Sequence, residues 1–184
     1  MNLIELISPK LTYSNVDGCS KKRVLNFIAE YVAAEYPDLL ESDVFNGLIQ
    51  RERLGSTGIG SGVAIPHCRV RNCNSIIGVF VKLAEPIDFD SVDSESVDLI
   101  FALIVPPEGH QSHLDALSKI AELFSQPKTV AALRSSEGKK QLYETLISHA
   151  TDGSQSTAQD NSGENSTAED STAEDSSATP TESA

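Results

Sequence analysis

Residues 51–67 read RERLGSTGIGSGVAIPH, a glycine-rich loop that runs through three apolar residues to a proline and a histidine. Glycine has no Cβ atom, so the backbone at Gly58, Gly60 and Gly62 is free to adopt positive φ and to approach a ligand closely. Pro66 fixes its own φ and favours an extended conformation at the residue before it. The stretch therefore predicts a loop that leads into a strand, with His67 presented at the end of that strand.

Helical patterns lie on both sides of this stretch. Apolar residues recur at helical spacing over residues 20–37, where Ser20 is the expected N-cap, and over residues 41–55, where Ser42 is the expected N-cap and Gly55 the stop. The same reasoning predicts three further helices, over residues 112–124, 127–133 and 137–150.

Three segments have the composition of strands, because they are rich in β-branched residues and bounded by turn residues: 62–67, 75–83 and 97–107. The third is apolar on both faces, which is typical of a central strand covered by helices on both sides. Helices alternating with strands in this order predict an α/β layered domain.

The composition changes near Ala150. Residues 151–184 contain no large apolar residue, Lys or Arg, repeat the units STAQD and STAED, and hold 8 of the 27 acidic residues. A segment without apolar residues cannot build a core. We therefore expect one domain over residues 1–150 and a disordered acidic tail over residues 151–184. The composition leaves open whether this tail attracts a basic partner or only aids solubility.

Charge and cysteine content exclude several classes of protein. The net charge of −13 argues against a nucleic-acid or anionic-membrane surface, since both need clustered Lys and Arg. The three cysteines form no C-x-x-C pair, and the first residues lack the basic start and long apolar run of a signal peptide. The longest apolar run, at residues 99–105, is shorter than a membrane helix. We expect a soluble protein of the reducing cytoplasm.

The glycine loop does not match the known nucleotide cradles. A Walker loop ends in Gly-Lys-Ser/Thr, whereas no lysine occurs in residues 51–67. A dinucleotide fingerprint follows a strand and opens a helix, whereas here a helix precedes the loop and a strand follows it. Two interpretations of the glycine loop therefore remain. It is either a flexible connector or a loop whose glycine backbone holds an anion beside His67.

Two further residues favour a phosphohistidine site. Ser112 and Asp115 have the spacing of a capping box, which puts His113 on the first turn of its helix, among unpaired N–H groups that favour an anion. Arg51 offers a planar donor fork for phosphoryl oxygens. A neutral imidazole at His67 supplies one nitrogen lone pair as the nucleophile.

Metal and cysteine chemistry fit the sequence less well. A zinc site made from His67, Cys68, Cys73 and His113 lacks the usual ligand spacing, and a Cys68 nucleophile paired with His113 fits less well still. Phosphoryl transfer between histidines needs positioning and charge rather than covalent help from the protein. We expect no metal and no cofactor.

The run RERLGSTGIGSGVAIPH, together with the HL-x-x-L-S helix after His113, resembles the enzyme IIA domain of the mannitol and fructose type in the bacterial phosphoenolpyruvate-dependent phosphotransferase system, and most of all its nitrogen-related branch. The resemblance covers residues 1–149. It implies a layered sandwich with a mixed β-sheet between helices. It also implies that His67 accepts a phosphoryl group from an HPr-like carrier charged by enzyme I, that His113 orients or stabilises the phosphorylated ring, and that Arg51 contacts the phosphoryl oxygens.

Three functions remain open from the sequence. The first is a phosphocarrier that regulates partner proteins, not identifiable from sequence, through the phosphorylation state of His67. The second is a sugar-specific IIA component that passes phosphate to a IIB partner. The third is a non-catalytic binding module that uses the glycine loop for recognition. His110 and His149 match no role in the family and are expected to be solvated.

Overall fold

The computed structural model describes residues 3–108 and 110–156 of the chain. The strands are β1 (Thr12–Val16), β2 (Gly58–Gly60), β3 (Val63–Ala64), β4 (His67–Arg69), β5 (Ile77–Ile87) and β6 (Val97–Val105). The helices are a 3₁₀ turn, η1 (Leu3–Leu6), followed by α1 (Lys21–Glu35), α2 (Glu41–Arg53), α3 (His110–Phe124), α4 (Pro127–Ser135) and α5 (Gly138–Ser156).

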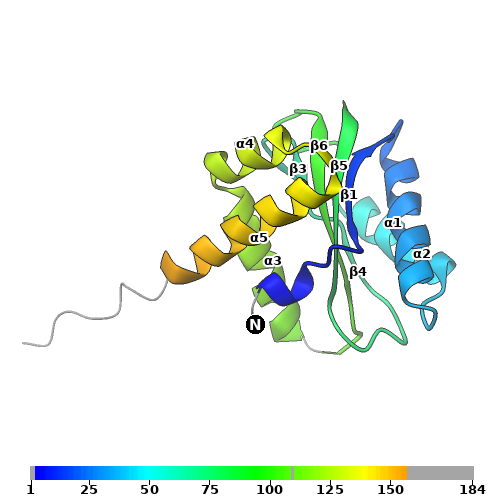
Figure 1. Ribbon diagram of the computed structural model, residues 1–184. Helices are drawn as coiled ribbons and strands as arrows, with labels where there is room; N and C mark the ends of the chain where they lie inside the picture. Colours follow the sequence, from blue (N-terminus) through cyan, green and yellow to red (C-terminus); the bar gives the residue numbers. More distant parts are fainter. Residues whose placement is uncertain (1–2, 109, 157–184) are drawn as a thin grey trace, which may run out of the picture.

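Across the described ranges the strands form one mixed six-stranded sheet in the order β1-β5-β6-β3-β2, with β4 as another neighbour of β6. β5 and β6 pair antiparallel, whereas β1 pairs parallel with β5, and β3 and β4 pair parallel with β6. The helices α1 and α2 cover one face, and α3, α4 and α5 cover the other (Figure 1). The predicted α/β sandwich with a mixed sheet is confirmed.

The central strand β6 divides the core into two layers. Its side chains alternate between the faces, and all of them except Asp98 are buried. Leu99, Phe101 and Leu103 pack in the cluster that includes α3 and α5, while Ile100, Ala102 and Ile104 pack in the cluster that includes α1 and α2. A strand buried on both faces must be apolar throughout, which explains the continuous run that the sequence showed.

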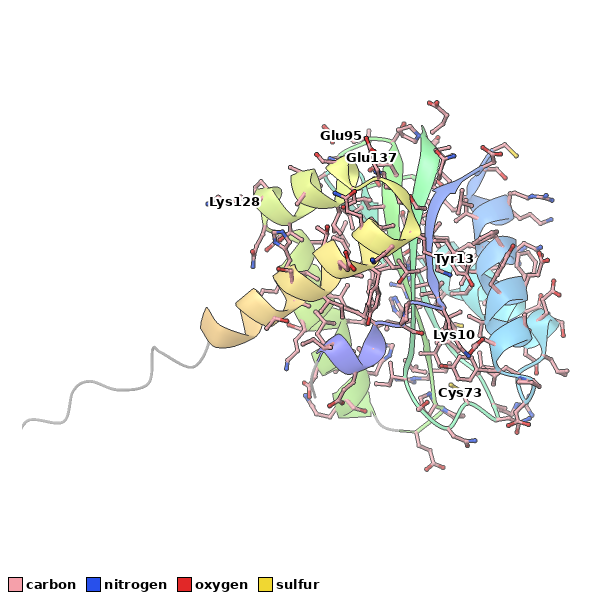
Figure 2. All side chains as sticks on the ribbon, in the orientation of Figure 1. Lys10, Tyr13, Cys73, Glu95, Lys128 and Glu137 are labelled. Carbon is pink, nitrogen blue, oxygen red and sulfur yellow. The ribbon has the colours of Figure 1, made fainter. Side chains whose placement is uncertain are left out.

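Helix α1 begins where the sequence predicted. The side chain of Ser20 accepts a hydrogen bond of 3.2 Å from the backbone N–H of Arg23. Tyr13 of β1 lies between that strand and α1 (Figure 2), and its ring centroid is 4.8 Å from that of Tyr31. The cap and this aromatic contact fix the helix against the edge of the sheet.

The N-cap predicted for helix α2 is wrong. The helix begins at Glu41, its N-cap is Leu40, and no side chain caps it. Ser42, the expected N-cap, therefore lies inside the first turn, where Glu41 and Asp43 complement the positive end of the helix dipole. The last turn carries Arg51 and Arg53, whose charges suit the negative end of the same dipole.

The final helix runs past the expected end of the domain. It ends at Ser156, so the first six residues of the predicted tail are helical. The remaining residues, 157–184, lie outside the described part, and the disorder expected for them stays a prediction. Within residues 3–108 and 110–156, no helix has the length and apolarity that a membrane span needs.

Gly62 occupies a position that only glycine fits. Its φ is +74°, and a Cβ atom there would lie 2.1 Å from Nη2 of Arg134. That guanidinium pairs with Asp98, with an Nη2–Oδ1 distance of 2.7 Å. We expect Gly62→Ala to lower the free energy of unfolding by about 2–4 kcal/mol in urea titrations, because it adds backbone strain and displaces the ion pair.

Gly138→Ala provides the matched control for this prediction. Gly138 has nearly the same φ, +75°, but a Cβ atom there meets nothing within 4 Å. The control is expected to lose only about 1 kcal/mol, the cost of a left-handed non-glycine residue. Equal losses in the two variants would contradict a role for the contact with Arg134.

Candidate functional site

His67 is the first residue of β4. The prediction that it ends a strand over residues 62–67 is wrong, because the structure divides this stretch into β3 and β4. His67 pairs in parallel with Leu103 of β6, and the carbonyl of Pro66 accepts a hydrogen bond of 2.9 Å from the Leu103 N–H. Proline cannot donate to a sheet, but its carbonyl still accepts, so Pro66 anchors the strand just before the histidine. The backbone of His67 is therefore held by the rigid centre of the sheet, and its ring is half-buried.

Both ring nitrogens of His67 have partners. Nδ1 lies 2.9 Å from the carbonyl oxygen of Ile65. A carbonyl only accepts hydrogen bonds, so Nδ1 carries the proton and Nε2 carries the lone pair. That lone pair accepts a hydrogen bond of 3.0 Å from Nε of Arg51. The contacts thus select one tautomer of the neutral imidazole.

Arg51 reaches His67 from the last turn of α2. Its Nη1 also donates a hydrogen bond of 2.9 Å to the carbonyl of Gly55, the residue that follows the end of the helix. These two hydrogen bonds orient the planar guanidinium, whose fork carries further N–H groups that can donate to an anion.

His113 completes the group from a third element, α3. Its ring centroid is 5.3 Å from that of His67, and the residue is only 8% exposed. The structure thus brings together Arg51, His67 and His113, the three side chains that the sequence singled out for the site.

Helix α3 differs from the expected one at its start. It begins at His110, so Ser112 lies within the helix and is not its N-cap. On the first two turns His113 and Ala116 are buried, whereas Leu114 is 58% exposed. The helix therefore presents His113, and not Leu114, to the interior of the domain.

The environment lowers the pKa of His67 below its ordinary value of 6.5. Burial is the main cause, since it disfavours the charged ring, and the charges of Arg51 and Arg69 act in the same direction. The hydrogen bond to Ile65 opposes them. The result is an imidazole that stays neutral, with Nε2 unprotonated, near pH 7.

The lowered pKa of His67 makes folding stability depend on pH. The unfolded chain binds a proton at this ring more tightly than the folded one, so the contribution of His67 is fully present above pH 6.5 and decreases as the pH falls through that value. We expect an NMR titration of the His67 ring to give a midpoint below 6.5 in the folded protein. The urea-unfolded protein is the control, and a folded midpoint at or above 6.5 would contradict the prediction.

A hollow of about 680 Å³ opens beside these residues. Three arginines from two elements, Arg51, Arg53 and Arg69, line it, and no carboxylate of residues 3–108 or 110–156 does. Its other lining residues are Gly47, Gln50, Leu54, His67, Cys68 and His113. A larger hollow of about 1010 Å³ shares Gln50 and Arg53 with it, but neither His67 nor His113 lines the larger one. The candidate site is therefore identified by its lining residues and not by its volume. We call the hollow of about 680 Å³ the arginine hollow.

The structure does not bring the predicted glycine cradle into this hollow. A Cβ atom at Gly58 would lie 2.3 Å from Oγ of Ser91, and one at Gly60 would lie 3.0 Å from Oδ2 of Asp93. Together with Gly62, these glycines form or adjoin the tight β2–β3 pairing, and none of them lines the hollow beside His67. They allow close packing against the chain's own loop before β6 and against α4.

Glu52 is a structural residue that sequence reasoning missed. Its carboxylate accepts hydrogen bonds from Thr57, at 2.6 Å from the hydroxyl and 3.2 Å from the N–H, and pairs with Nζ of Lys21 at 3.0 Å. The carbonyl of Thr57 in turn accepts from the N–H of Ile65, the residue whose carbonyl binds the His67 ring. Acidic residues are disfavoured at the C-terminal end of a helix, so Glu52 in that position was a signal of a specific partner.

The cysteines do not join the chemistry. Burial raises the pKa of the Cys68 thiol to about 12, so the thiol stays protonated and is poorly suited to act as a nucleophile or metal ligand. Cys73 lies in the loop between β4 and β5 (Figure 2), and burial raises the pKa of its thiol as well. Over residues 3–108 and 110–156, no three side chains of the metal-binding types come together.

Comparison with known proteins identifies the class. The family model for the phosphoenolpyruvate-dependent sugar phosphotransferase system, EIIA 2, matches residues 5–149, and the chain belongs to this family. Members of this family are phosphotransfer components, and IIA domains pass phosphate to partner proteins. Within the family the chain is a IIA-Ntr-like component, as its relatives indicate.

Two relatives and two solved structures illustrate this placement. The nitrogen regulatory protein of Pseudomonas aeruginosa is 41% identical over 147 residues, which cover 80% of this chain and 96% of the relative. That of Escherichia coli is 38% identical, covering 79% and 90%. The crystal structure of the nitrogen regulatory protein IIA-Ntr from Neisseria meningitidis superposes with a TM-score of 0.74 at 35% identity, covering 78% of this chain and 98% of that one. The mannitol IIA structure from Escherichia coli, at 15% identity and a TM-score of 0.63, shares the fold, covering 76% of this chain and 98% of that one.

Proposed function

We propose that this protein accepts a phosphoryl group on Nε2 of His67 from the phosphohistidine of an HPr-like carrier, and that the phosphorylation state of His67 regulates partner proteins. The observation that supports the proposal is the neutral ring of His67. Its Nε2 lone pair accepts a hydrogen bond from Arg51, and the residue lines a hollow with three arginines and, among the described residues, no carboxylate. We expect this role to be exercised in the cytoplasm.

The transfer follows from the contacts of the ring. The lone pair of Nε2 forms the new P–N bond while the P–N bond of the donor breaks, and the electron pair of that bond returns to the donor ring. The proton on Nδ1 remains at the Ile65 carbonyl, which stabilises the positive charge that develops on the ring. No other covalent step is needed from the protein.

Arg51 changes partner during this reaction. In the structure its Nε donates to Nε2 of His67, the atom that must attack phosphorus. The guanidinium therefore moves from the ring nitrogen to the phosphoryl oxygens, which it suits as a bidentate donor. His113 has its ring 5.3 Å from that of His67. This proximity supports a role in which His113 orients the phosphorylated ring or donates to the same oxygens.

The test is intact-protein mass spectrometry after incubation with phosphoenolpyruvate, enzyme I and an HPr-like carrier. One phosphoryl increment that is lost in acid, as expected of a phosphohistidine, supports the proposal. No increment, with a carrier shown to be charged, overturns it and leaves the third possibility, a non-catalytic binding module.

The sugar-specific alternative differs from the proposed function in whether the phosphoryl group on His67 is passed on to a IIB protein. The sugar-specific alternative is supported by one relative, a fructose-specific EIIA component from Haloferax volcanii that is 31% identical over 101 residues. Rapid passage of phosphate from His67 to a IIB protein of the fructose or mannitol type would favour that reading. A regulatory member is expected to hold the phosphoryl group in the presence of such a protein.

A further inference from the structure

The arginine hollow continues into a second basic depression. A neighbouring hollow of about 310 Å³ shares Gly47, Gln50 and Arg69 with it and adds Arg71. Asp43 is the only carboxylate that lines this second hollow among the described residues. Four arginines thus lie along one continuous surface, from the end of α2 to the loop after β4.

Most of this positive charge is not neutralised by the domain itself. The ion pairs found within the described residues use Lys10, Lys21, Arg134 and Lys140, and none uses an arginine of this surface. Arg53, Arg69 and Arg71 are exposed to solvent. A basic surface on a chain with a net charge of −13 stands in strong contrast to the rest of the molecule.

The chain carries a segment of complementary charge. Residues 157–184 include seven acidic residues and no basic one. The match to the family model ends at residue 149, so this segment lies outside the matched domain. The described helix α5 ends at Ser156, from which the segment starts.

The segment is long enough to reach the arginines. Its 28 residues span at most about 100 Å when extended. A globular body of this size has a radius of gyration of about 15 Å, and half its circumference is about 60 Å. Tethering also gives the segment an effective concentration of the order of millimolar, so weak contacts suffice for binding.

We propose that the acidic segment 157–184 docks on the arginine surface of its own chain and that phosphorylation of His67 releases it. The docking follows from the charges and the reach described above. The release rests on the proposed function: a phosphoryl group on His67 brings about two negative charges into the hollow and takes the arginines as its own partners. The segment then competes with an incoming carrier in the unphosphorylated state and leaves the surface in the phosphorylated state.

The first test measures docking without any phosphoryl transfer. In a full-length variant, the seven acidic residues of the segment are replaced by Asn or Gln, and its backbone amide NMR spectrum is compared with that of the native chain in low salt. We expect shift differences at Arg53, Arg69 and Arg71 that disappear at about 0.5 M NaCl, where the Debye length is only a few ångströms. Absence of these differences in low salt would overturn the docking.

Two controls make this result specific. A full-length chain with the order of residues 157–184 scrambled keeps the charge and should keep the native shifts, because the contact depends on charge and length. Shifts that vanish on dilution would instead assign the contact to a second copy of the chain and overturn the intramolecular proposal.

The second test measures phosphoryl uptake. At low salt the neutral-segment variant is expected to accept phosphate about twofold to tenfold faster than the native chain, because no segment occupies the hollow. Slower uptake would show that the segment recruits the donor, which overturns the competition. If neither chain is phosphorylated while the NMR differences persist, the proposed function and the release fail but the docking stands.

Discussion

The His67→Ala variant is expected to take up no phosphoryl group from a charged HPr-like carrier. In the native chain Nε2 of His67 is unprotonated and directed toward Arg51 at the edge of the arginine hollow. Alanine removes the nucleophile and leaves the surrounding donors in place. Because the ring is half-buried and makes two hydrogen bonds, we expect a loss in folding free energy of only about 1–2 kcal/mol. The variant should therefore be folded but inactive.

Intact-protein mass spectrometry and circular dichroism check both parts of this expectation. His149→Ala is the matched control, because that histidine lies on α5, where its Nδ1 is 3.0 Å from Oγ1 of Thr129, and it does not line the hollow. The control should acquire one increment. An acid-labile increment on His67→Ala would move the acceptor to another ring, with His113 as the next residue to replace.

The Arg51→Gln variant is expected to accept phosphate about 10²- to 10³-fold more slowly than the native chain, a typical loss when one donor to a developing anion is removed. Arg51 is the only arginine of the hollow for which the structure shows a hydrogen bond to the His67 ring in the described residues. Glutamine keeps much of the length of the side chain but loses the charge and the fork. The rate is measured by rapid quench with the charged carrier.

A second readout of Arg51→Gln separates charge from simple damage to the site. The charge of Arg51 lowers the pKa of His67, so its removal should raise the midpoint of the ring titration. Arg51→Lys should give an intermediate rate, since lysine keeps the charge without the bidentate fork. Arg53→Gln, which removes an exposed arginine from the same hollow, should change the rate far less. Equal rates for Arg51→Gln and Arg53→Gln would contradict the proposed contact with the phosphoryl group.

Local signals in the sequence were sufficient for the main elements. The cap at Ser20 and the stop before Pro37 bound α1 closely, since a hydroxyl that accepts from a helix N–H acts within one turn. The apolar run that became β6 was recognised as a central strand because burial on both faces leaves no polar position. The order of helices and strands then limited the fold to a layered α/β domain.

The sequence failed where distant parts of the chain decide the structure. β1 was not predicted, because its residues TYSNV alternate weakly and Asn15 has a φ of +58°. Its strand conformation depends on parallel pairing with β5, more than 60 residues later. The burial of His113 and the exposure of Leu114 likewise depend on what α3 packs against and not on the helix's own pattern.

The glycine loop was predictable in its backbone conformation but not in its contacts. Its unusual composition was visible in the sequence, and positive φ values at Gly60 and Gly62 bear out the reason for glycine there. Which atoms the loop approaches was not visible. Its close neighbours are Ser91, Asp93 and Arg134, which are up to 72 residues away along the chain.

The sequence by itself determined the α/β class, the choice of the histidines and the arginine that we propose carry the chemistry, and the contrast in composition between residues 1–150 and residues 151–184. These are local properties, since periodicity, capping and composition act over a few residues. Only the tertiary structure decided that Arg51, His67 and His113 meet, which nitrogen of His67 keeps its lone pair, and that four arginines share one surface. Those features arise from contacts between α2, α3 and the sheet, and the packing that sets such contacts is not encoded within any one segment.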